Sequence, residues 1–405
     1  MTAHANSESS AAHSAPAHDD VRWMGVGQSD DPDPTAAGRA AAQGAIQGPD
    51  PQLLIVFSST AYDLPQVLRA IERAGQGAAL IGCSTAGEIA ASNVGDANVV
   101  VMALGGSGFS VATAAASGAS SRLREAGAEA AECLARTDER RHRVLLLLTD
   151  GLAGDQQEIV RGAYGVVGAG IPLVGGSAGD NLEMRETFQL FGGQVLGDAV
   201  VAAAISSDGP MGIGVRHGWQ SVGDPMLVTK SRESRVYTLD DRPALDVYLD
   251  RLDAPPEART DPGAFTRFAL THPLGLPNRI GETHIRFVAD ADFEERSIGC
   301  IAQVPQGGLT WFMEGDAGSV LEATDGACHD ALEPLNGEVP LGLVAFDCIA
   351  RRGVLGEEGV QAEVDRLCAQ AGGAAVAGFY TYGEIARTHG MAGFHNQTLV
   401  VLALS

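Results

Sequence analysis

The sequence contains few aromatic residues and no long apolar run. Aromatic residues make up 5% of the 405 residues, whereas Gly occurs 52 times. No apolar stretch reaches the roughly 20 residues that a membrane-spanning helix requires. Residues 1–20 are rich in Ala, Ser, His and Asp and have neither the basic start nor the apolar segment of a signal peptide. We therefore expect a disordered tail over residues 1–20 and a cytoplasmic protein that does not bind membranes.

Paired cysteines and nucleotide-binding or zinc-peptidase motifs are also missing. The six cysteines are scattered without a CxxC pair, which is typical of reduced, mostly buried thiols in a cytosolic protein. No P-loop, HExxH or strand–helix GxGxxG occurs. Nucleotide hydrolysis and zinc-dependent proteolysis therefore have no support in the sequence.

Positive charge is scarce as well. The chain has 27 Lys and Arg against 51 Asp and Glu, which gives a net charge of −24. Such a surface repels phosphate backbones and anionic lipids, so we expect no nucleic-acid partner. Hydrophobic residues make up 45% of the chain and allow large cores.

A strand–helix–strand pattern occurs three times in the sequence. In the first copy, Asp63 is placed to cap a helix whose apolar residues recur at helical spacing. The first and third copies share Gly-x-x-Thr-x-Gly-Glu-Ile-Ala after their last strand, which indicates an internal repeat. In the three copies the Gly-rich loop begins at Gly82, Gly175 and Gly378. The pattern predicts an α/β fold of repeated strand–helix–strand units in mixed sheets.

The repeats predict two domains after the tail. Two contiguous units, ending in a strand pair at Val200–Ile205 and Met211–Val215, form a domain over residues 21–225. A segment rich in Pro, Arg and Asp precedes the third unit, and together they form a domain over residues 226–405.

The order and spacing of several motifs resemble the FIST family, in both its N-terminal and its C-terminal domain. The motifs are Val26–Pro32, Gly82–Glu88, Pro172–Asp180, Pro273–Gly275, Tyr380–Glu384 and Phe394–Thr398. The resemblance implies a bacterial-type intracellular ligand-sensing module, with amino acids among the suggested ligands. Its relatives are often attached to output domains. Because no such domain is found here, we expect signalling through a separate partner protein.

The Gly-rich loops follow strand ends, where open α/β sheets place their ligands. We therefore expect a small polar metabolite to bind where the loops converge, without chemical conversion. The carboxylates would hold a positively charged group, and the hydroxyls and backbone amides its negative end. The alternative is that glycines only form turns and carboxylates only cap backbone. The candidate ligand-binding residues are Ser84, Thr85, Glu88, Ser177, Asp180, Tyr380, Thr381, Glu384, His395 and Asn396.

Two other functions remain open at this point. Gly175–Gly179 spells G-x-S-x-G, so Ser177 is a candidate hydrolase nucleophile, although a loop rather than a helix is expected after it. The resemblance also implies haem, because some relatives are described as nitric-oxide sensors. The candidate axial ligands are His217, His284, His329 and His389.

Overall fold

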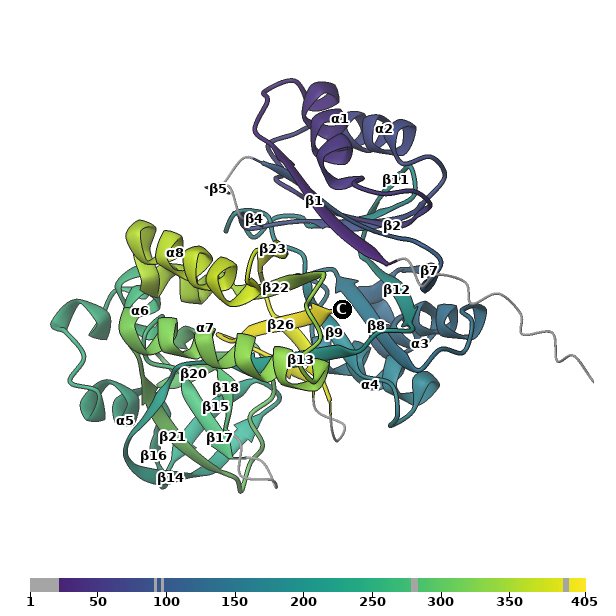
Figure 1. The fold of residues 1–405 in the computed structure, drawn as a ribbon. Coiled ribbons are helices and arrows are strands. Elements are labelled where there is room, and N and C mark those ends of the chain that lie inside the picture. The colour runs from purple at the N-terminus through teal and green to yellow at the C-terminus, as the bar shows by residue number, and fades with distance from the viewer. Residues whose placement is uncertain (1–21, 91–92, 96–97, 278–282, 389–392) are drawn as a thin grey trace, which may run out of the picture.

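The computed structural model describes residues 22–90, 93–95, 98–277, 283–388 and 393–405. These residues form three units of one topology and an insert (Figure 1). Each unit has the strand order first, fourth, second, third, so that β1-β6-β2-β3, β7-β12-β8-β9 and β13-β26-β22-β23 correspond. The second and third strands of each unit are parallel, and the fourth strand pairs antiparallel with the first and second. The predicted α/β class with repeated units in mixed sheets is confirmed.

The bounds of the elements follow the three repeats. Unit 1 consists of β1 (Trp23–Ser29), α1 (Pro34–Ala45), β2 (Pro51–Ser58), α2 (Leu64–Ala74), β3 (Ala79–Ser84) and β6 (Val99–Gly105). Unit 2 consists of β7 (Phe109–Ser117), η1 (Ala119–Ser121), α3 (Leu123–Ala131), η2 (Glu132–Arg136), β8 (His142–Thr149), α4 (Gln156–Val167), β9 (Leu173–Ser177) and β12 (Ala199–Ser207). Unit 3 consists of β13 (Met211–Arg216), α7 (Ala317–Leu332), η4 (Glu333–Leu335), β22 (Gly342–Cys348), α8 (Ile349–Ala371), β23 (Ala375–Thr381) and β26 (Leu399–Leu404).

Local sequence signals place the helices on the outer faces of the sheets. Asp63 caps α2 by accepting the Gln66 backbone N–H, as predicted, and Gly75 ends the helix. Val67, Leu68 and Ile71 of α2 pack against the outer face of the unit 1 sheet. Helices α3 and α4 cover the unit 2 sheet, and α7 and α8 cover the unit 3 sheet, in the same way.

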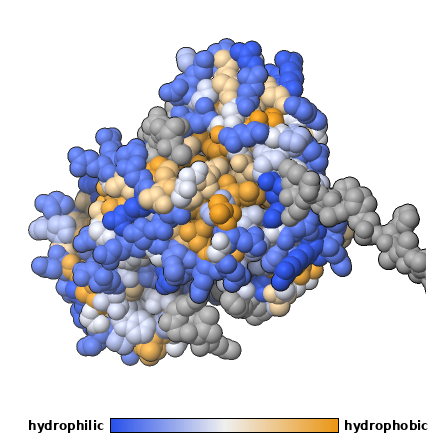
Figure 2. Space-filling view, in the orientation of Figure 1, coloured by the Kyte–Doolittle hydropathy of each residue, from blue (hydrophilic) through white to orange (hydrophobic). Residues whose placement is uncertain are grey.

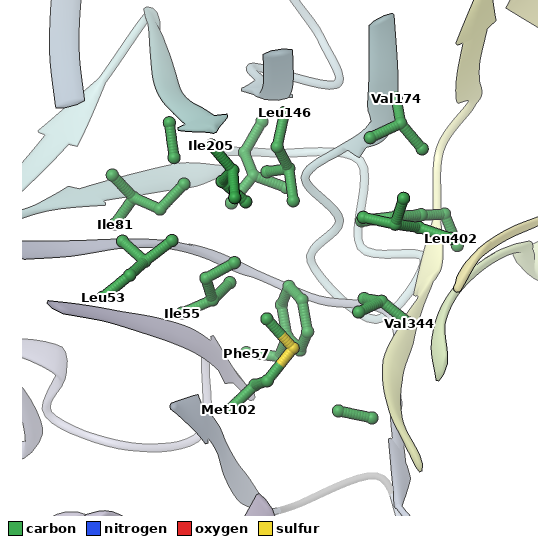
Figure 3. Close-up of a cluster of buried hydrophobic side chains, with 14 of the residues drawn as sticks. Leu53, Ile55, Phe57, Ile81, Met102, Leu146, Val174, Ile205, Val344 and Leu402 are labelled. Carbon is green, nitrogen blue, oxygen red and sulfur yellow. The ribbon is translucent and has the colours of Figure 1, made fainter. Parts of the chain in front are cut away.

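The inner faces of the three sheets share one core. Side chains alternate along each strand, so Leu53, Ile55 and Phe57 of β2 point inward while Leu54 and Val56 point to the helices. Figure 3 shows this inner cluster, in which unit 1 side chains meet Leu146 and Ile205 of unit 2 and Val344 and Leu402 of unit 3. The units therefore cannot separate without exposing a common hydrophobic core.

Each unit also sends a hairpin into the sheet of another unit. The hairpin after β3 pairs with β23 of unit 3, the one after β9 pairs with β3 of unit 1, and the one after β23 pairs with β9 of unit 2. These hairpins are β4–β5 (Glu88–Ala90, Asn93–Gly95), β10–β11 (Phe188–Phe191, Gln194–Gly197) and β24–β25 (Glu384–Arg387, Phe394–His395). The exchange is cyclic and includes all three units.

The insert lies between β13 and α7 of unit 3 and has its own antiparallel sheet and core, in which Tyr248, Phe265 and Phe312 pack together. Its first and last strands are paired through Gln220 and Glu314, so the insert leaves and rejoins the unit at one place. Its elements are β14 (Gln220–Arg232), β15 (Arg235–Leu239), β16 (Arg242–Pro243), α5 (Ala244–Arg251), η3 (Pro256–Arg259), α6 (Pro262–Ala269), β17 (Leu274–Pro277), β18 (Thr283–Arg286), β19 (Val288–Asp292), β20 (Ser297–Cys300) and β21 (Leu309–Glu314).

One strand belongs to a different unit from the one predicted. Met211–Val215 does not pair with the second unit, because β13 forms an antiparallel pair with β26 near the end of the chain. Position 225, the predicted domain boundary, falls inside β14. The division into domains at 225 stays a prediction, and the predicted tail lies outside the described residues.

Among the described helices, none combines the length and the apolar character needed to cross a bilayer. All six cysteines are free, and five of them are buried, as the sequence predicts.

Candidate functional site

The three Gly-rich loops come together, as predicted. Each loop forms backbone hydrogen bonds with both of the others, and we call this contact region the loop hub (residues 82–88, 175–180 and 378–384). The bonds run from Gly179 N to Ser84 O (3.0 Å), from Ala86 N to Tyr380 O (3.0 Å), from Tyr380 N to Gly87 O (2.8 Å), from Ser177 N to Gly383 O (2.8 Å) and from Tyr382 N to Ser177 O (3.1 Å). The loops therefore contact one another directly.

The repeated Thr-x-Gly-Glu motif forms the same hydrogen bonds in units 1 and 3. In unit 3, the Thr381 hydroxyl donates to Glu384 Oε1 at 2.6 Å, and Glu384 Oε2 accepts the Thr398 N–H at 3.1 Å. Both glutamates are fully buried. In unit 1, Thr85 donates to Glu88 Oε1, and Asn98 N donates to Glu88 Oε2 at 3.1 Å. The motif thus ties each hairpin to the last strand of its own unit.

Burial changes the charge of Glu384. Removal from water raises its pKa to about 8, although the bonds from Thr381 and Thr398 act in the opposite direction. At neutral pH the carboxyl is therefore mostly protonated. Its contacts are those of a group that fixes the fold, and its predicted role in binding a cation stays a prediction.

The Ser84 hydroxyl and the Asp180 carboxylate also form hydrogen bonds within the protein. Ser84 Oγ donates to Gly179 O at 2.7 Å and accepts Phe188 N–H at 2.9 Å. Asp180 accepts the Tyr382 hydroxyl and three consecutive backbone N–H groups, and despite partial burial these bonds lower its pKa. The three N–H donors are those of Met184, Arg185 and Glu186.

Ser177 is buried at the end of β9, and its hydroxyl lies 2.9 Å from that of Thr149. The chain continues from Ser177 into a loop and then strand β10, so no helix follows directly. A nucleophile elbow requires a strand–turn–helix, which this segment does not form.

His395 and Asn396 lie beyond the hub, at the end of strand β25. His395 Nε2 lies 2.9 Å from the Ala386 carbonyl, and burial lowers the pKa of His395 to about 3, so the ring is neutral. Asn396 is 1% exposed, and neither of its side-chain polar atoms finds a partner among the described residues.

Tyr380, one of the predicted ligand-binding residues, belongs to a buried polar group whose other members were not predicted. We call this group the acid cluster (Thr324, Asp347, Arg351, Glu363 and Tyr380). All five side chains are fully buried between the unit 3 sheet and its helices. Arg351 connects the two acids, because its Nε donates to Asp347 at 2.6 Å and its Nη2 to Glu363 at 2.5 Å. Thr324 donates to Glu363 at 2.7 Å.

The two acids of this cluster differ in their titration. Burial and repulsion from Glu363 raise the pKa of Asp347 well above its usual range, against the pull of Arg351. Burial also opposes ionisation of Glu363, but Arg351 and the hydrogen bonds it accepts lower its pKa. Asp347 is therefore the weaker acid of the pair, and its carboxyl is hydrogen-bonded to that of Glu363.

A surface hollow of about 330 Å³ lies beside the second loop, at the carboxyl end of β8. Asp150 and Asp198 contribute carboxylates to its wall, and Arg185 contributes a guanidinium. Asp150 is occupied by the Thr187 hydroxyl and the backbone N–H groups of Leu152 and Asp198. The complete lining is Ser120, Asp150, Leu152, Ala153, Arg185, Glu186, Thr187, Phe188, Gly197 and Asp198.

The described residues do not fit haem at this hollow or at a second one of about 590 Å³ beside η2, since neither has a histidine in its lining. His217 is neutral because burial, and then Arg351, lower its pKa to about 4, and its Nδ1 accepts the Trp219 N–H. His329 is exposed on α7, and the ring centroids of His284 and His395 lie 5.5 Å apart. His389 lies outside the described residues. Within the described ranges, no three His, Cys, Asp or Glu side chains lie close enough to hold a metal ion.

Weak sequence signals could have pointed to the residues that were missed. Asp347 interrupts the apolar strand β22, and Arg351 follows it by one helical turn. Asp150 directly follows strand β8. Arg185 and Asp198 lie in loops, and the sequence around them has no comparable pattern.

Comparison with known proteins agrees with the resemblance seen in the motifs. The FIST N domain matches residues 52–242, and the FIST C domain matches residues 244–387. An uncharacterized protein of Methanocaldococcus jannaschii is 31% identical over 114 residues, which cover 26% of this chain and 22% of that protein. The chain thus matches less than a quarter of that relative's length. Because the two domain matches together cover most of the sequence, the chain belongs to the FIST family.

Proposed function

We propose that this protein is a sensor that binds a small polar metabolite, such as an amino acid, in the hollow at the end of β8 and signals to a separate partner protein. One observation carries the proposal. The loop that forms a wall of the hollow is also bound into the loop hub, where all three units meet.

The chemistry of the hollow suits a zwitterion. The Arg185 guanidinium is largely exposed, and the ion pair it forms among the described residues is a long one, 3.5 Å, with Glu183. It is therefore available for the carboxylate of a ligand. Asp198 is held by the backbone and hydroxyl groups of Ser120 and presents a carboxylate for an amino group. A volume of about 330 Å³ is at the lower end of the usual range for small-molecule sites.

The same wall offers a route from ligand to hub. Arg185 and Glu186 line the hollow, and their backbone N–H groups donate to Asp180. Asp180 in turn accepts the hydroxyl of Tyr382 from the third loop. A ligand that moves the Arg185 backbone would change these bonds and so the contact between units 2 and 3.

Thermal-shift screening of amino acids and related polar metabolites tests the proposal, followed by calorimetric titration of whichever compound stabilises the protein. A ligand at a hundred times its Kd should add about 3 kcal/mol to the free energy of unfolding. Arg185→Ala and Asp198→Asn should each weaken binding about tenfold, because the first removes a hydrogen bond to the ligand carboxylate and the second removes the negative charge that faces its amino group.

Arg73→Ala is the matched control, since Arg73 is exposed at the end of α2, away from the hollow. The Arg73→Ala variant should bind the stabilising compound with the same affinity as the wild type. Equal affinities for Arg185→Ala and Arg73→Ala would remove the hollow from consideration, and a panel without any stabilising compound would count against the sensor itself.

We further propose that binding takes place without chemical conversion. Two observations support this proposal. The Ser177 hydroxyl lies within hydrogen-bonding distance of the Thr149 hydroxyl, and no helix directly follows Ser177. A fluorophosphonate probe should leave the wild-type protein unlabelled. Labelling that disappears in Ser177→Ala would instead establish a serine hydrolase.

A further inference from the structure

The surface hollow at the end of β8 has more negative than positive groups in its wall. Among the described residues that line it, Asp150, Glu186 and Asp198 contribute three carboxylates, and Arg185 contributes a guanidinium. The Arg185 charge is also shared with Glu183, which lies outside the lining. A neutral amino acid has one carboxylate and one ammonium group, so it would leave this excess of negative charge uncompensated.

The three carboxylates differ in how far the fold already uses them. Asp150 accepts the Thr187 hydroxyl and two backbone N–H groups. Asp198 accepts the backbone N–H and the hydroxyl of Ser120. The Glu186 side chain is exposed and forms no hydrogen bond or ion pair with any described residue. Glu186 is therefore the carboxylate of the lining that is most available to a ligand.

Glu186 and Asp198 both lie at the open end of the hairpin β10–β11. Phe188, the first residue of β10, pairs with Gly197, the last residue of β11. Glu186 precedes this pair by two residues, and Asp198 follows it by one. Paired strands lie about 5 Å apart, so the two acids border the hollow from adjacent segments of the chain. A ligand with two positive groups separated by a few bonds could therefore reach both.

The hollow also has an apolar part. Leu152, Ala153 and Phe188 belong to its lining, and Leu152 is 36% exposed. The methylene chain of a long basic side chain can pack on such a surface while its charged end stays in water. The lining thus offers contacts to each part of a basic amino acid.

The charge of the whole protein acts in the same direction. The chain has a net charge of −24. Apart from an apolar area near its centre, the face shown in Figure 2 is mostly hydrophilic. The field of such a protein attracts cations and repels anions. A ligand with a net positive charge is therefore favoured over a neutral or an acidic one.

Building on the proposed function, we propose that the hollow selects basic amino acids and that Glu186 recognises the positive charge of their side chain. Arg185 then holds the ligand carboxylate, and Asp198 holds its α-amino group. The side-chain ammonium or guanidinium group has Glu186 as its partner, and the methylene chain packs on Leu152 and Phe188. The additional positive charge of such a ligand offsets part of the negative charge of the lining.

Calorimetric titration of the full chain with L-lysine, L-norleucine and L-glutamate tests this selectivity. Lysine and norleucine have the same carbon skeleton, but only lysine has the terminal amino group. We expect lysine to bind about fivefold more tightly than norleucine, since a pair of exposed charges contributes modestly, and glutamate to bind most weakly. The advantage of lysine should shrink as sodium chloride is added, because salt screens exposed charges.

Glu186→Gln is the decisive variant, because it removes the negative charge and keeps both the shape of the side chain and the backbone N–H that donates to Asp180. Lysine and norleucine should bind this variant with nearly equal affinity. Glu257→Gln, in η3 of the insert, is the matched control, since Glu257 is exposed and does not line the hollow. This control should keep the wild-type preference for lysine. A preference for lysine that survives in Glu186→Gln would overturn the role of Glu186.

The titrations separate a failure of this selectivity from a failure of the proposed function. Equal affinities of the wild type for lysine and norleucine would overturn the selection of basic amino acids and leave an amino-acid sensor in place. Stabilisation by other metabolites alone would do the same and leave a sensor of a different ligand. A thermal-shift screen in which no compound stabilises the protein, with lysine, arginine and ornithine included, would count against both proposals.

Discussion

At the scale of single residues, the same side chains that look like ligand-binding groups build the centre of the fold. Glu88 and Glu384 each accept a threonine hydroxyl and a backbone N–H from the segment before the last strand of the unit. The identical pattern in two units shows that the repeated motif encodes a buried connection. Buried carboxyl groups are stable in this setting because their oxygens are hydrogen-bonded.

The raised pKa of Glu384 predicts a pH dependence of stability. Its folded pKa of about 8 lies above the usual value of 4.5, so between these values the folded state holds a proton that the unfolded state has released. The free energy of unfolding should therefore fall as pH rises from 4.5 to 8 and then level off. Glu384→Gln should reduce this slope by up to about 1.4 kcal/mol per pH unit.

Urea denaturation across this pH range measures the effect. Glu125→Gln serves as the control, because Glu125 is exposed on α3. A slope in Glu384→Gln as steep as in the wild type would show that Glu384 is ionised in the folded protein.

At the scale of elements, the segment between β9 and β10 combines left-handed backbone with exposed apolar side chains. Asn181, Leu182 and Met184 have φ values of 59°, 65° and 53°. Leu182 is 61% exposed, and its N–H donates to the Tyr382 hydroxyl at 2.7 Å. Left-handed φ is unfavourable for leucine, so the hydrogen bonds to Asp180 and Tyr382 must hold the segment in this shape.

Relief of this backbone strain is testable by substitution with glycine. Leu182→Gly should raise the free energy of unfolding by about 1 kcal/mol, because glycine adopts left-handed φ without a steric penalty. Leu227→Gly in strand β14, where Leu227 is 41% exposed, should lower it by a similar amount. Denaturant titration of both variants measures the change in the free energy of unfolding. Changes of the same sign in the two variants would contradict the interpretation.

At the scale of the whole molecule, the exchanged hairpins and the shared inner core join the three units into one structure. Unit 2 receives β24 from unit 3, and unit 3 receives β4 from unit 1. A two-domain cut at residue 225 would remove β24 and β26 from their partners β9 and β13. The units therefore depend on one another for complete sheets.

This dependence predicts how fragments behave. A fragment of residues 21–225 should fail to unfold cooperatively, because it lacks the strands and core residues of unit 3. Circular dichroism and hydrogen exchange on this fragment and on the full chain provide the comparison. Full amide protection of β8 and β9 in the isolated fragment would instead support an independent N-terminal domain.

The sequence indicated the three Gly-rich loops, but none of the ten predicted ligand-binding residues lines the hollow at the end of β8. The first and third loops were found because Gly82 to Ala90 and Gly378 to Ala386 share a repeated motif, but the three loops follow strands of three different sheets and come together through the packing of those sheets. Asp198 and Arg185 line the hollow from different segments of the chain, and no local sequence pattern indicates that they do. Likewise, the link between Asp347 and Glu363 depends on the break in α8.

The sequence by itself determined the α/β class, the three repeats, the helix caps and the family, because these depend on local periodicity and short motifs. Only the tertiary structure decided which sheet each strand joins, as β13 and β26 pair across almost 200 residues of chain. It also decided that the repeated glutamates are buried and that Arg185 lines the same hollow as Asp150 and Asp198. The physical reason is that burial and contact between distant segments depend on how the sheets pack.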